Sequence, residues 1–389
     1  MSRALFVVMS LWAAVAGAQA TGAAEGGPPA PRPAEEKPVE KAAPFKLPEW
    51  LTRFKVWGWA NVYAFPYFER NYPDPNKNLF RIRFARLVVD FSPHDDFTAR
   101  LHLAGEQASS ALFFDYFVTW KRFDFANVTV GQQKIMLGAS ISQPGFELTM
   151  LDRPKFVTQF TKQNFRDIGL TVHTGRGPTP RVFEYSVGLY NGTGRVPFAA
   201  NVPNRGDSDL LLAARAVVNP APLFLGKQAR LALGVTGAVE STGVSPDATT
   251  ARNNLGMALV PWATARTTYL LGADLNVSGL GGLWLLGEVM FVQSEARPAG
   301  TSRRMLGWYV ELGYTLPVFD GLLQPVARFE WADPDTSSVA NEEVVGSAGL
   351  NVRPFTWLLV SAFYSRDALI TPTGVPMTNR VELRLQARY

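Results

Sequence analysis

The sequence predicts an all-β fold, a transmembrane antiparallel β-barrel of about sixteen strands preceded by a short disordered N-terminal arm. Three observations lead to this prediction: an export signal, repeated segments in which apolar and polar residues alternate, and connections whose lengths alternate along the chain. The composition agrees, because aromatic residues make up 12% of the 389 residues and charged residues only 18%. After the export signal, no stretch reaches the roughly 20 consecutive apolar residues that a transmembrane helix needs.

The beginning of the chain has the three parts of a secretory signal peptide. A positive charge at Arg3 precedes an apolar stretch over residues 4–16, and the small-residue site AQA follows at 18–20. We therefore expect residues 1–20 to be a signal peptide and the protein to reside in the cell outer membrane. Cysteine is absent, so the sequence offers no disulfide framework.

Residues 21–50 are rich in Pro, Ala, Glu and Lys, and they lack large apolar residues before Phe45. A segment of this composition cannot bury a core of its own. We therefore expect a flexible periplasmic arm at 21–50 and a barrel domain over residues 51–389.

The barrel domain contains sixteen segments of about ten residues with a period of two, which is the signature of transmembrane strands. Short turns, such as residues 92–96 and 123–126, alternate with longer loops, such as 65–78. Together with the even number of segments, this alternation places both ends of the barrel domain in the periplasm. The segments lie near 52–64, 79–91, 97–105, 112–122, 127–135, 166–175, 181–190, 208–218, 228–240, 266–277, 282–295, 303–316, 323–332, 342–353, 356–366 and 378–389.

The last segment alternates without interruption. Its lipid face is predicted to carry Val381, Leu383, Leu385, Ala387 and Tyr389, and its other face Arg380, Glu382, Arg384, Gln386 and Arg388. A terminal strand that ends on an aromatic residue resembles the signal by which the barrel assembly machinery recognises its substrates. We therefore expect two partners, that machinery and outer-membrane lipid.

Charge fixes which face of each strand looks inward, because an Arg or Lys on the lipid face near the midplane costs about 2–4 kcal/mol. On segment 97–105 this cost predicts Arg100 and His102 inside the barrel. The residues predicted to face lipid on this segment are Phe97, Ala99, Leu101 and Leu103. On segment 112–122 the cost predicts Asp115, Thr119 and Lys121 inside and Phe114, Tyr116, Val118 and Trp120 outside. The same reasoning assigns these residues to the lumen: Lys134, Arg215, Arg230, Asp274, Glu288, Glu311, Arg328, Arg353, Arg380, Arg384 and Arg388.

Segment 79–91 does not follow a single alternation, since Arg81 and Arg83 share one face and Arg86 and Asp90 the other. A β-bulge near Phe84–Ala85 would restore the phase. The alternative is that one of the two sets lies at a rim of the barrel; we favour the bulge.

A charged lumen in a sixteen-stranded barrel is an aqueous channel, so the predicted function is passive diffusion of small solutes. The connection at 136–165 spans about thirty residues, which is typical of a functional segment. We expect it to fold into the lumen and narrow it, although an extracellular flap is the alternative. Its charged residues are Glu147, Asp152, Arg153, Lys155 and Lys162.

Arginine binds phosphate and carboxylate with two parallel hydrogen bonds, so a series of lumenal arginines favours inorganic anions such as phosphate. Lumenal acids are nearly as common, however, and Arg–Asp or Arg–Glu pairs that brace the wall are the other interpretation of most of these arginines. A general, non-selective porin therefore stays open as an alternative.

Other function classes have little support in the sequence. The net charge of +5 is spread over single residues rather than runs, which argues against nucleic acid as a partner. A hydrolase embedded in the barrel is a remaining alternative, but the chain has only His94, His102 and His173 and no nucleophile-elbow or zinc-protease motif. We expect neither enzymatic activity nor a cofactor or metal.

Several stretches resemble the phosphate-selective porin O and P family: FRIRFARLVVDF, LFFDYFVTWK followed by VTVGQQKI, FELTMLDRP followed by FRDIGLTV, EYSVGLYNGTG, LLGADL, LLGEVMF, MLGWYVELGYTL, PVARFEW and GLNVRP. They cover most of residues 52–389 in the family's order. The resemblance implies a homotrimeric outer-membrane channel for anions, selective for phosphate or polyphosphate in some members. The sequence departs from the family's pattern at Gln133, where an aromatic residue is usual, and at Asp152, where Glu is commoner.

The resemblance implies roles for matching residues, namely Arg81, Arg83, Lys134 and Arg153 in the anion pathway, with Arg166 and the constriction acid Asp115 matching more loosely. The lumenal pattern and the long connection add further residues to the predicted pathway: Arg100, Lys121, Lys155, Lys162, Arg328 and Arg384.

Overall fold

A computed structural model describes residues 48–64, 80–105, 113–161, 165–175, 181–192, 210–226, 229–242, 265–297, 302–318 and 321–389. All the described residues belong to one compact unit, Pro48–Tyr389. The predicted signal peptide and most of the predicted arm therefore lie outside the described residues.

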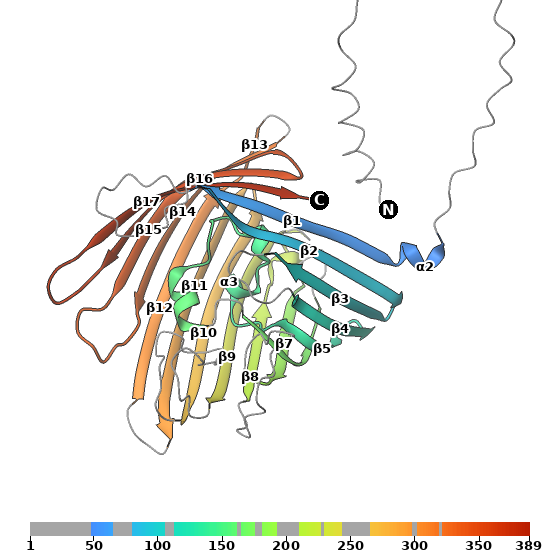
Figure 1. Ribbon diagram of the computed structural model, residues 1–389, viewed down its shortest axis with the longest axis horizontal. Helices are drawn as coiled ribbons and strands as arrows, with labels where there is room; N and C mark the ends of the chain where they lie inside the picture. Colours follow the sequence, from blue (N-terminus) through green and yellow to red (C-terminus); the bar gives the residue numbers. More distant parts are fainter. Residues whose placement is uncertain are drawn as a thin grey trace, which may run out of the picture. The chain divides into compact units, whose positions relative to one another are not determined.

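The described residues form a single sheet in which every neighbouring pair is antiparallel (Figure 1). β12 and β13 keep one register against β14 and are separated only by Thr315, so they form one wall strand. The predicted sixteen-stranded barrel is thus confirmed. Its strands are β1 Phe54–Ala64, β2 Phe80–His94, β3 Phe97–Ala104, β4 Phe113–Phe123, β5 Ala126–Lys134, β6 Arg166–His173, β7 Phe183–Tyr190, β8 Leu211–Val218, β9 Arg230–Thr242, β10 Ala265–Leu280, β11 Leu283–Arg297, β12 Ser302–Tyr314, β13 Leu316–Val318, β14 Gly321–Asp333, β15 Glu343–Phe355, β16 Leu358–Leu369 and β17 Met377–Arg388.

The barrel closes where the first strand pairs with the last, with Trp59 opposite Arg388 and Ala64 opposite Leu383. Tyr389 completes this seam, because its backbone exchanges two hydrogen bonds with Gly58, of 3.0 and 3.1 Å. Its phenol group donates to the carbonyl oxygen of Arg86 at 3.2 Å. A Cβ atom on residue 58 would lie only 2.6 Å from the Tyr389 hydroxyl oxygen, so the tyrosine ring requires glycine beneath it.

Alternation along the strands separates a lipid face from an inner face, as on β16. Ser361 and Phe363 are buried inside the barrel, whereas Val360 and Tyr364 are exposed on the outside. Apolar residues on the outer face match a lipid surround.

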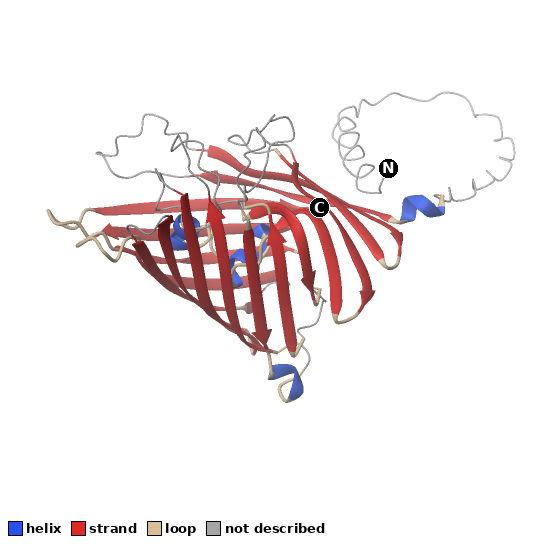
Figure 2. Ribbon diagram, turned by 90° about the horizontal axis from the view of Figure 1, so that it is seen from below, coloured by secondary structure: helices blue, strands red, loops and turns tan. Residues whose placement is uncertain are grey.

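Over the described residues, five short helical segments accompany the strands: α2 Glu49–Thr52, α3 Ala139–Ser142, η1 Gly145–Glu147, α4 Lys155–Phe160 and η2 Ala221–Leu223. Three of them, α3, η1 and α4, belong to the connection between β5 and β6, which lies within the barrel (Figures 1 and 2). We call this connection, residues 135–165, the inner loop. Over the described ranges, no helix has the length and apolar character to cross a membrane.

Two β-bulges change the phase of the wall. In β2 the register with β1 shifts between Asn61 and Val62, which leaves Arg83 as an extra residue. The bulge expected near Phe84–Ala85 is therefore present one residue earlier. It brings Arg83 and Arg86 to the same, lumenal side.

The second bulge was not predicted. The register of β3 with β4 shifts between His102 and Leu103, which leaves Phe114 as an extra residue on β4. Phe114 is therefore buried in the lumen beside Asp115, and the expectation that it faces lipid was wrong. A bulge inserts one residue without a partner and so places two successive side chains on one face.

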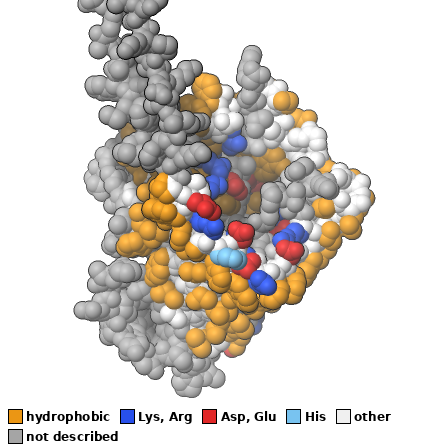
Figure 3. All heavy atoms as spheres, turned by 90° about the vertical axis from the view of Figure 1, so that its right-hand side faces the viewer, with side chains coloured by type: hydrophobic (Ala, Val, Ile, Leu, Met, Phe, Trp, Pro, Cys, Tyr) orange, Lys and Arg blue, Asp and Glu red, His pale blue; other side chains and the backbone are white. Residues whose placement is uncertain are grey.

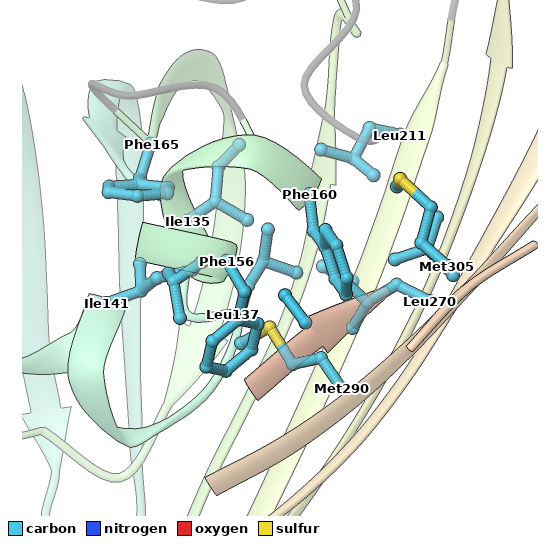
Figure 4. Close-up of a cluster of buried hydrophobic side chains, with 14 of the residues drawn as sticks. Ile135, Leu137, Ile141, Phe156, Phe160, Phe165, Leu211, Leu270, Met290 and Met305 are labelled. Carbon is cyan, nitrogen blue, oxygen red and sulfur yellow. The ribbon is translucent and has the colours of Figure 1, made fainter. Parts of the chain in front are cut away.

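An apolar cluster inside the barrel holds the inner loop against the wall (Figure 4). Phe156 and Phe160 of α4 are fully buried, and their rings meet edge to face at 5.5 Å. The wall contributes inward-facing apolar side chains at Leu211, Leu270, Met290, Val292, Met305 and Tyr309. The hydrophobic effect thus acts inside the barrel as well as at its lipid face.

Candidate functional site

The lumen contains a cavity of about 2030 Å³ bounded by the inner loop and by strands of the first half of the wall, with contributions from the second half. Figure 3 shows a hollow around which Lys and Arg side chains lie close to Asp and Glu side chains. The two signs of charge are therefore mixed, and the function depends on which cations are neutralised by a neighbouring acid.

The inner loop is tied to the opposite wall by hydrogen bonds from residues far away in sequence. Tyr63 donates its hydroxyl to the Leu151 carbonyl oxygen at 3.0 Å. Asn351 donates to the carbonyl oxygen of Thr149 at 2.9 Å, and Gln386 to that of Phe146 at 3.0 Å. These donors belong to β1, β15 and β17, so the loop crosses the lumen from the β5–β6 side.

Arg384 is the centre of this attachment. It is buried, with 2% of its surface exposed, and its guanidinium donates to the carbonyl oxygens of Leu148, Thr149 and Met150 at 3.1, 3.3 and 3.3 Å. It also donates to Ser361 Oγ at 2.9 Å. Three successive carbonyl dipoles converge on one cation, so Arg384 fixes the loop and does not line the cavity.

Arg328 has a similar place on β14, behind the loop. Its guanidinium lies between Glu330 at 2.7 Å and Glu311 at 3.4 Å, and it donates to the Asp152 carbonyl oxygen at 2.8 Å. With two carboxylates beside it, this buried arginine is neutralised and braces the wall.

Arg83, at the first bulge, forms an ion pair with Asp152 of the inner loop. The Arg83 guanidinium also lies 5.1 Å from the centre of the Tyr63 ring. Both partners line the cavity and are partly exposed, so the pair connects the wall to the tip of the loop.

Lys134 and Arg153 converge on a single acceptor. Lys134 Nζ donates to the Gln143 carbonyl oxygen at 2.9 Å, and Arg153 Nη2 donates to the same oxygen at 2.6 Å. Arg153 has no carboxylate in ion-pair range among the residues that the structure describes. Burial lowers its pKa to about 10, which still leaves the guanidinium charged at neutral pH. Because both side chains line the cavity, they concentrate positive charge at the loop.

Asp115 of β4 has two side-chain partners, Arg166 of β6 and His102 of β3. Arg166 Nε donates to one carboxylate oxygen at 2.6 Å, and His102 Nδ1 lies 2.7 Å from the other. Phe114 packs between two guanidinium groups, those of Arg86 and Arg166, each 3.6 Å from its ring centre. The predicted constriction acid is therefore part of a buried, neutralised cluster.

Nearer the short turns, Arg100 donates to both oxygens of Asp90, at 2.6 and 3.0 Å. By contrast, Lys55, Lys121 and Arg388 line the cavity, are exposed, and take part in no ion pair within the described ranges. Within the described ranges, Lys55, Lys121, Arg153 and Arg388 are therefore cavity-lining cations without a carboxylate in ion-pair range.

The remaining predicted residues lie elsewhere. Lys155 begins α4 and forms an ion pair with Glu343 at 2.8 Å, away from the cavity. Arg81 is a residue of β2, and its backbone pairs with that of Tyr63 in β1. The side chain of Arg81 lies outside the described part of the structure. Lys162 is also outside the described residues. No group of three or more His, Asp or Glu side chains in the described ranges is arranged to hold a metal ion.

Two lumenal features were missed at the level of sequence, the shared acceptor Gln143 and the aromatic residues beside Arg388. The alternation of β1 does contain a signal for the second, because Trp57 and Trp59 fall on the same face as Lys55. Nothing in the sequence indicates that a backbone carbonyl would join Lys134 to Arg153.

Comparison with known proteins gives a family match and a fold match. The model of a family described as phosphate-selective porin O and P matches residues 59–323. No curated protein matches the chain.

The fold is similar to that of several solved structures. An anion-selective porin from Comamonas acidovorans is 11% identical with a TM-score of 0.59, and 86% of this chain and 99% of that one are covered. OmpT of Vibrio cholerae in its trimer form is 10% identical with a TM-score of 0.58 and the same coverage. The outer-membrane channel DcaP of Acinetobacter baumannii is 15% identical with a TM-score of 0.57, over 86% and 97% of the two chains. At these identities the likeness shows the fold alone.

Proposed function

Because the chain belongs to the phosphate-selective porin O and P family and is an outer-membrane channel, we propose that its lumen prefers anions and admits inorganic phosphate. One observation carries this proposal: Lys134 and Arg153 meet on the Gln143 carbonyl oxygen at the cavity surface, and Arg153 has no carboxylate partner in the described ranges. Two cations held together in a confined space attract anions and repel cations.

The exposed cations Lys55, Lys121 and Arg388 support the same preference. They lie toward the short turns, away from the inner loop, and so extend the positive path through the lumen. An anion can pass from one cation to the next, which permits selectivity without trapping.

A general, weakly selective porin is the second candidate. The observation in its favour is that acids neutralise most lumenal arginines, as in the pairs of Arg83 with Asp152, Arg166 with Asp115 and Arg215 with Asp274. Such pairs brace the wall and add little net charge to the pore.

Reversal potential across a planar bilayer under a KCl gradient distinguishes the two candidates. Anion preference predicts a potential of the sign set by chloride, and Arg153→Gln should move it toward zero. Lys155→Gln is the matched control, since this lysine of the same loop does not line the cavity. A cation-selective wild-type channel, or an equal change in both variants, would contradict the proposal. Added phosphate should reduce the chloride current of the wild type more than that of Arg153→Gln.

We also propose that the porin is a homotrimer and that the barrel assembly machinery recognises β17 through Tyr389. The solved structure of OmpT in its trimer form supports the first part. A native mass of three chains in detergent is expected, and removal of Tyr389 should lower the amount of assembled barrel in the membrane without changing synthesis.

A further inference from the structure

Arg388 differs from the other lumenal arginines in its surroundings. Its guanidinium lies 4.5 Å from the centre of the Phe146 ring and 5.9 Å from that of Trp57. It is exposed to the cavity and makes no ion pair among the described residues. Aromatic rings cover part of this guanidinium, and no carboxylate of the described ranges accepts a hydrogen bond from its N–H groups.

Trp57 is held in a fixed orientation next to it. Its indole N–H donates to Asp90 Oδ2 at 3.0 Å, and the Arg100 guanidinium lies 5.8 Å from its ring centre. Trp59 stacks on it at 5.8 Å with an interplanar angle of 25°. Trp57 is half-buried and lines the cavity, so part of an already positioned ring is open to a solute.

This arrangement matches one class of anion better than others. The in-plane N–H groups of an arginine bind a carboxylate with two parallel bonds. An aromatic ring attached to that carboxylate can pack against Trp57 and the neighbouring guanidinium. Phosphate can bind to the charge of Arg388 but has no ring to pack against Trp57. A carboxylate that carries a saturated ring has no π face for the tryptophan and the guanidinium to contact.

We propose that Trp57, Phe146 and Arg388 form a subsite for aromatic carboxylates on the short-turn side of the inner loop. The subsite deepens the proposed anion preference and rests on it. Arg388 binds the carboxylate, Trp57 packs against the ring, and Phe146, which is buried with 9% of its surface exposed, supports Arg388 from the inner loop.

A purely structural role of the same aromatics makes a different prediction. Phe146 also packs against Trp59 and Val88, and this cluster helps to hold the inner loop. If holding the loop were the whole role of Trp57, its replacement would alter the passage of all anions to the same extent.

The test compares benzoate with cyclohexanecarboxylate, two monocarboxylates of similar size, as blockers of chloride current through the full-length channel in planar bilayers. Benzoate should halve the current at a concentration about fivefold lower, given the usual strength of aromatic and cation–π contacts. Trp57→Leu should abolish this difference. Trp357→Leu should keep it, because Trp357 also lines the cavity but has no guanidinium over its ring in the described structure.

Arg388→Lys is the second variant, which keeps the charge and removes the planar group. It should retain the sign of the reversal potential while losing most of the preference for benzoate. Equal block by the two carboxylates in the wild type would overturn the subsite, and so would equal weakening of both blockers in Trp57→Leu. The proposed anion preference stands or falls separately, since the reversal potential in KCl measures it without either carboxylate.

Discussion

Arg83 on the barrel wall forms an ion pair with Asp152 of the inner loop, and a one-residue bulge makes this contact possible. The bulge brings Arg83 onto the lumenal side that Arg86 also occupies. The pair therefore places an acid in the lumen beside one of the family's expected anion-binding arginines and reduces its effect on a passing solute.

Replacement of Asp152 by Asn should increase anion preference, because it removes a negative charge from the cavity wall beside the Arg83 guanidinium. The expected result is a reversal potential under a KCl gradient shifted further toward that of chloride. Asp95→Asn is the control, since Asp95 is exposed in the β2–β3 turn. An unchanged potential in Asp152→Asn would show that the pair does not influence permeation.

Replacement of Arg384 by Met should loosen the inner loop while leaving the strand pairs intact. Three loop carbonyl groups would lose a charged donor, and of these the Thr149 carbonyl keeps its hydrogen bond from Asn351. A buried carbonyl group left without a partner costs about 1–3 kcal/mol. We expect more frequent current fluctuations in single-channel recordings and a higher mean conductance. Arg353→Gln, an exposed position on β15, should behave like the wild type.

Truncation of Phe156 to Ala should destabilise the docked loop by about 3–5 kcal/mol, the usual cost of removing a buried phenylalanine ring. The ring packs directly over Gly307 of β12, so the wall cannot fill the vacated space with a side chain. Limited proteolysis of the folded barrel should then cleave the inner loop faster. Thr158→Ala on the cavity side of α4 is the comparison, and equal cleavage of the two variants would contradict the prediction.

Gly58→Ala should weaken the barrel seam, because the new methyl group would lie 2.2 Å from the Arg86 carbonyl oxygen and 2.6 Å from the Tyr389 hydroxyl oxygen. The folded, heat-modifiable form on gels should convert to the unfolded form at a lower temperature. Gly346→Ala on β15 adds the same atom where nothing lies within 4 Å. A seam that tolerates alanine at 58 as well as at 346 would refute the packing described here.

The sequence predicted the barrel well because strand alternation is a local property, read from one segment at a time. The alternation of β17 alone predicts that Arg384 faces the lumen and that Leu383 and Leu385 face outward. Bulges are harder to predict from the sequence, because they depend on the register between two strands. The bulge at Arg83 was visible only as a charge conflict, and the one at Phe114 gave no conflict because either face accepts an aromatic ring.

The interior was harder to predict for a related reason. A charged residue marks the lumenal face of a strand, but the inward-facing residues Met290 and Val292 of β11 are apolar and give no such mark. The residues on either side of Met290 face outward and are apolar as well, so the two faces of this strand look alike in the sequence. A continuous apolar run there was the available signal for a wall that packs against protein on its inner side. The ion pair of Arg328 with Glu311 joins two neighbouring strands, so only the register brings these residues together, whereas Glu330 lies two residues further along the same strand.

The hydrogen bonds from β17 to the inner loop also have a consequence for the order in which the channel is built. Arg384 and Gln386 belong to the strand that closes the barrel against β1, and together they donate to the carbonyl oxygens of residues 146 and 148–150. A nascent wall to which β17 has not yet been added lacks these contacts. We therefore expect the same strand to complete both the closure of the barrel wall and the anchoring of the inner loop.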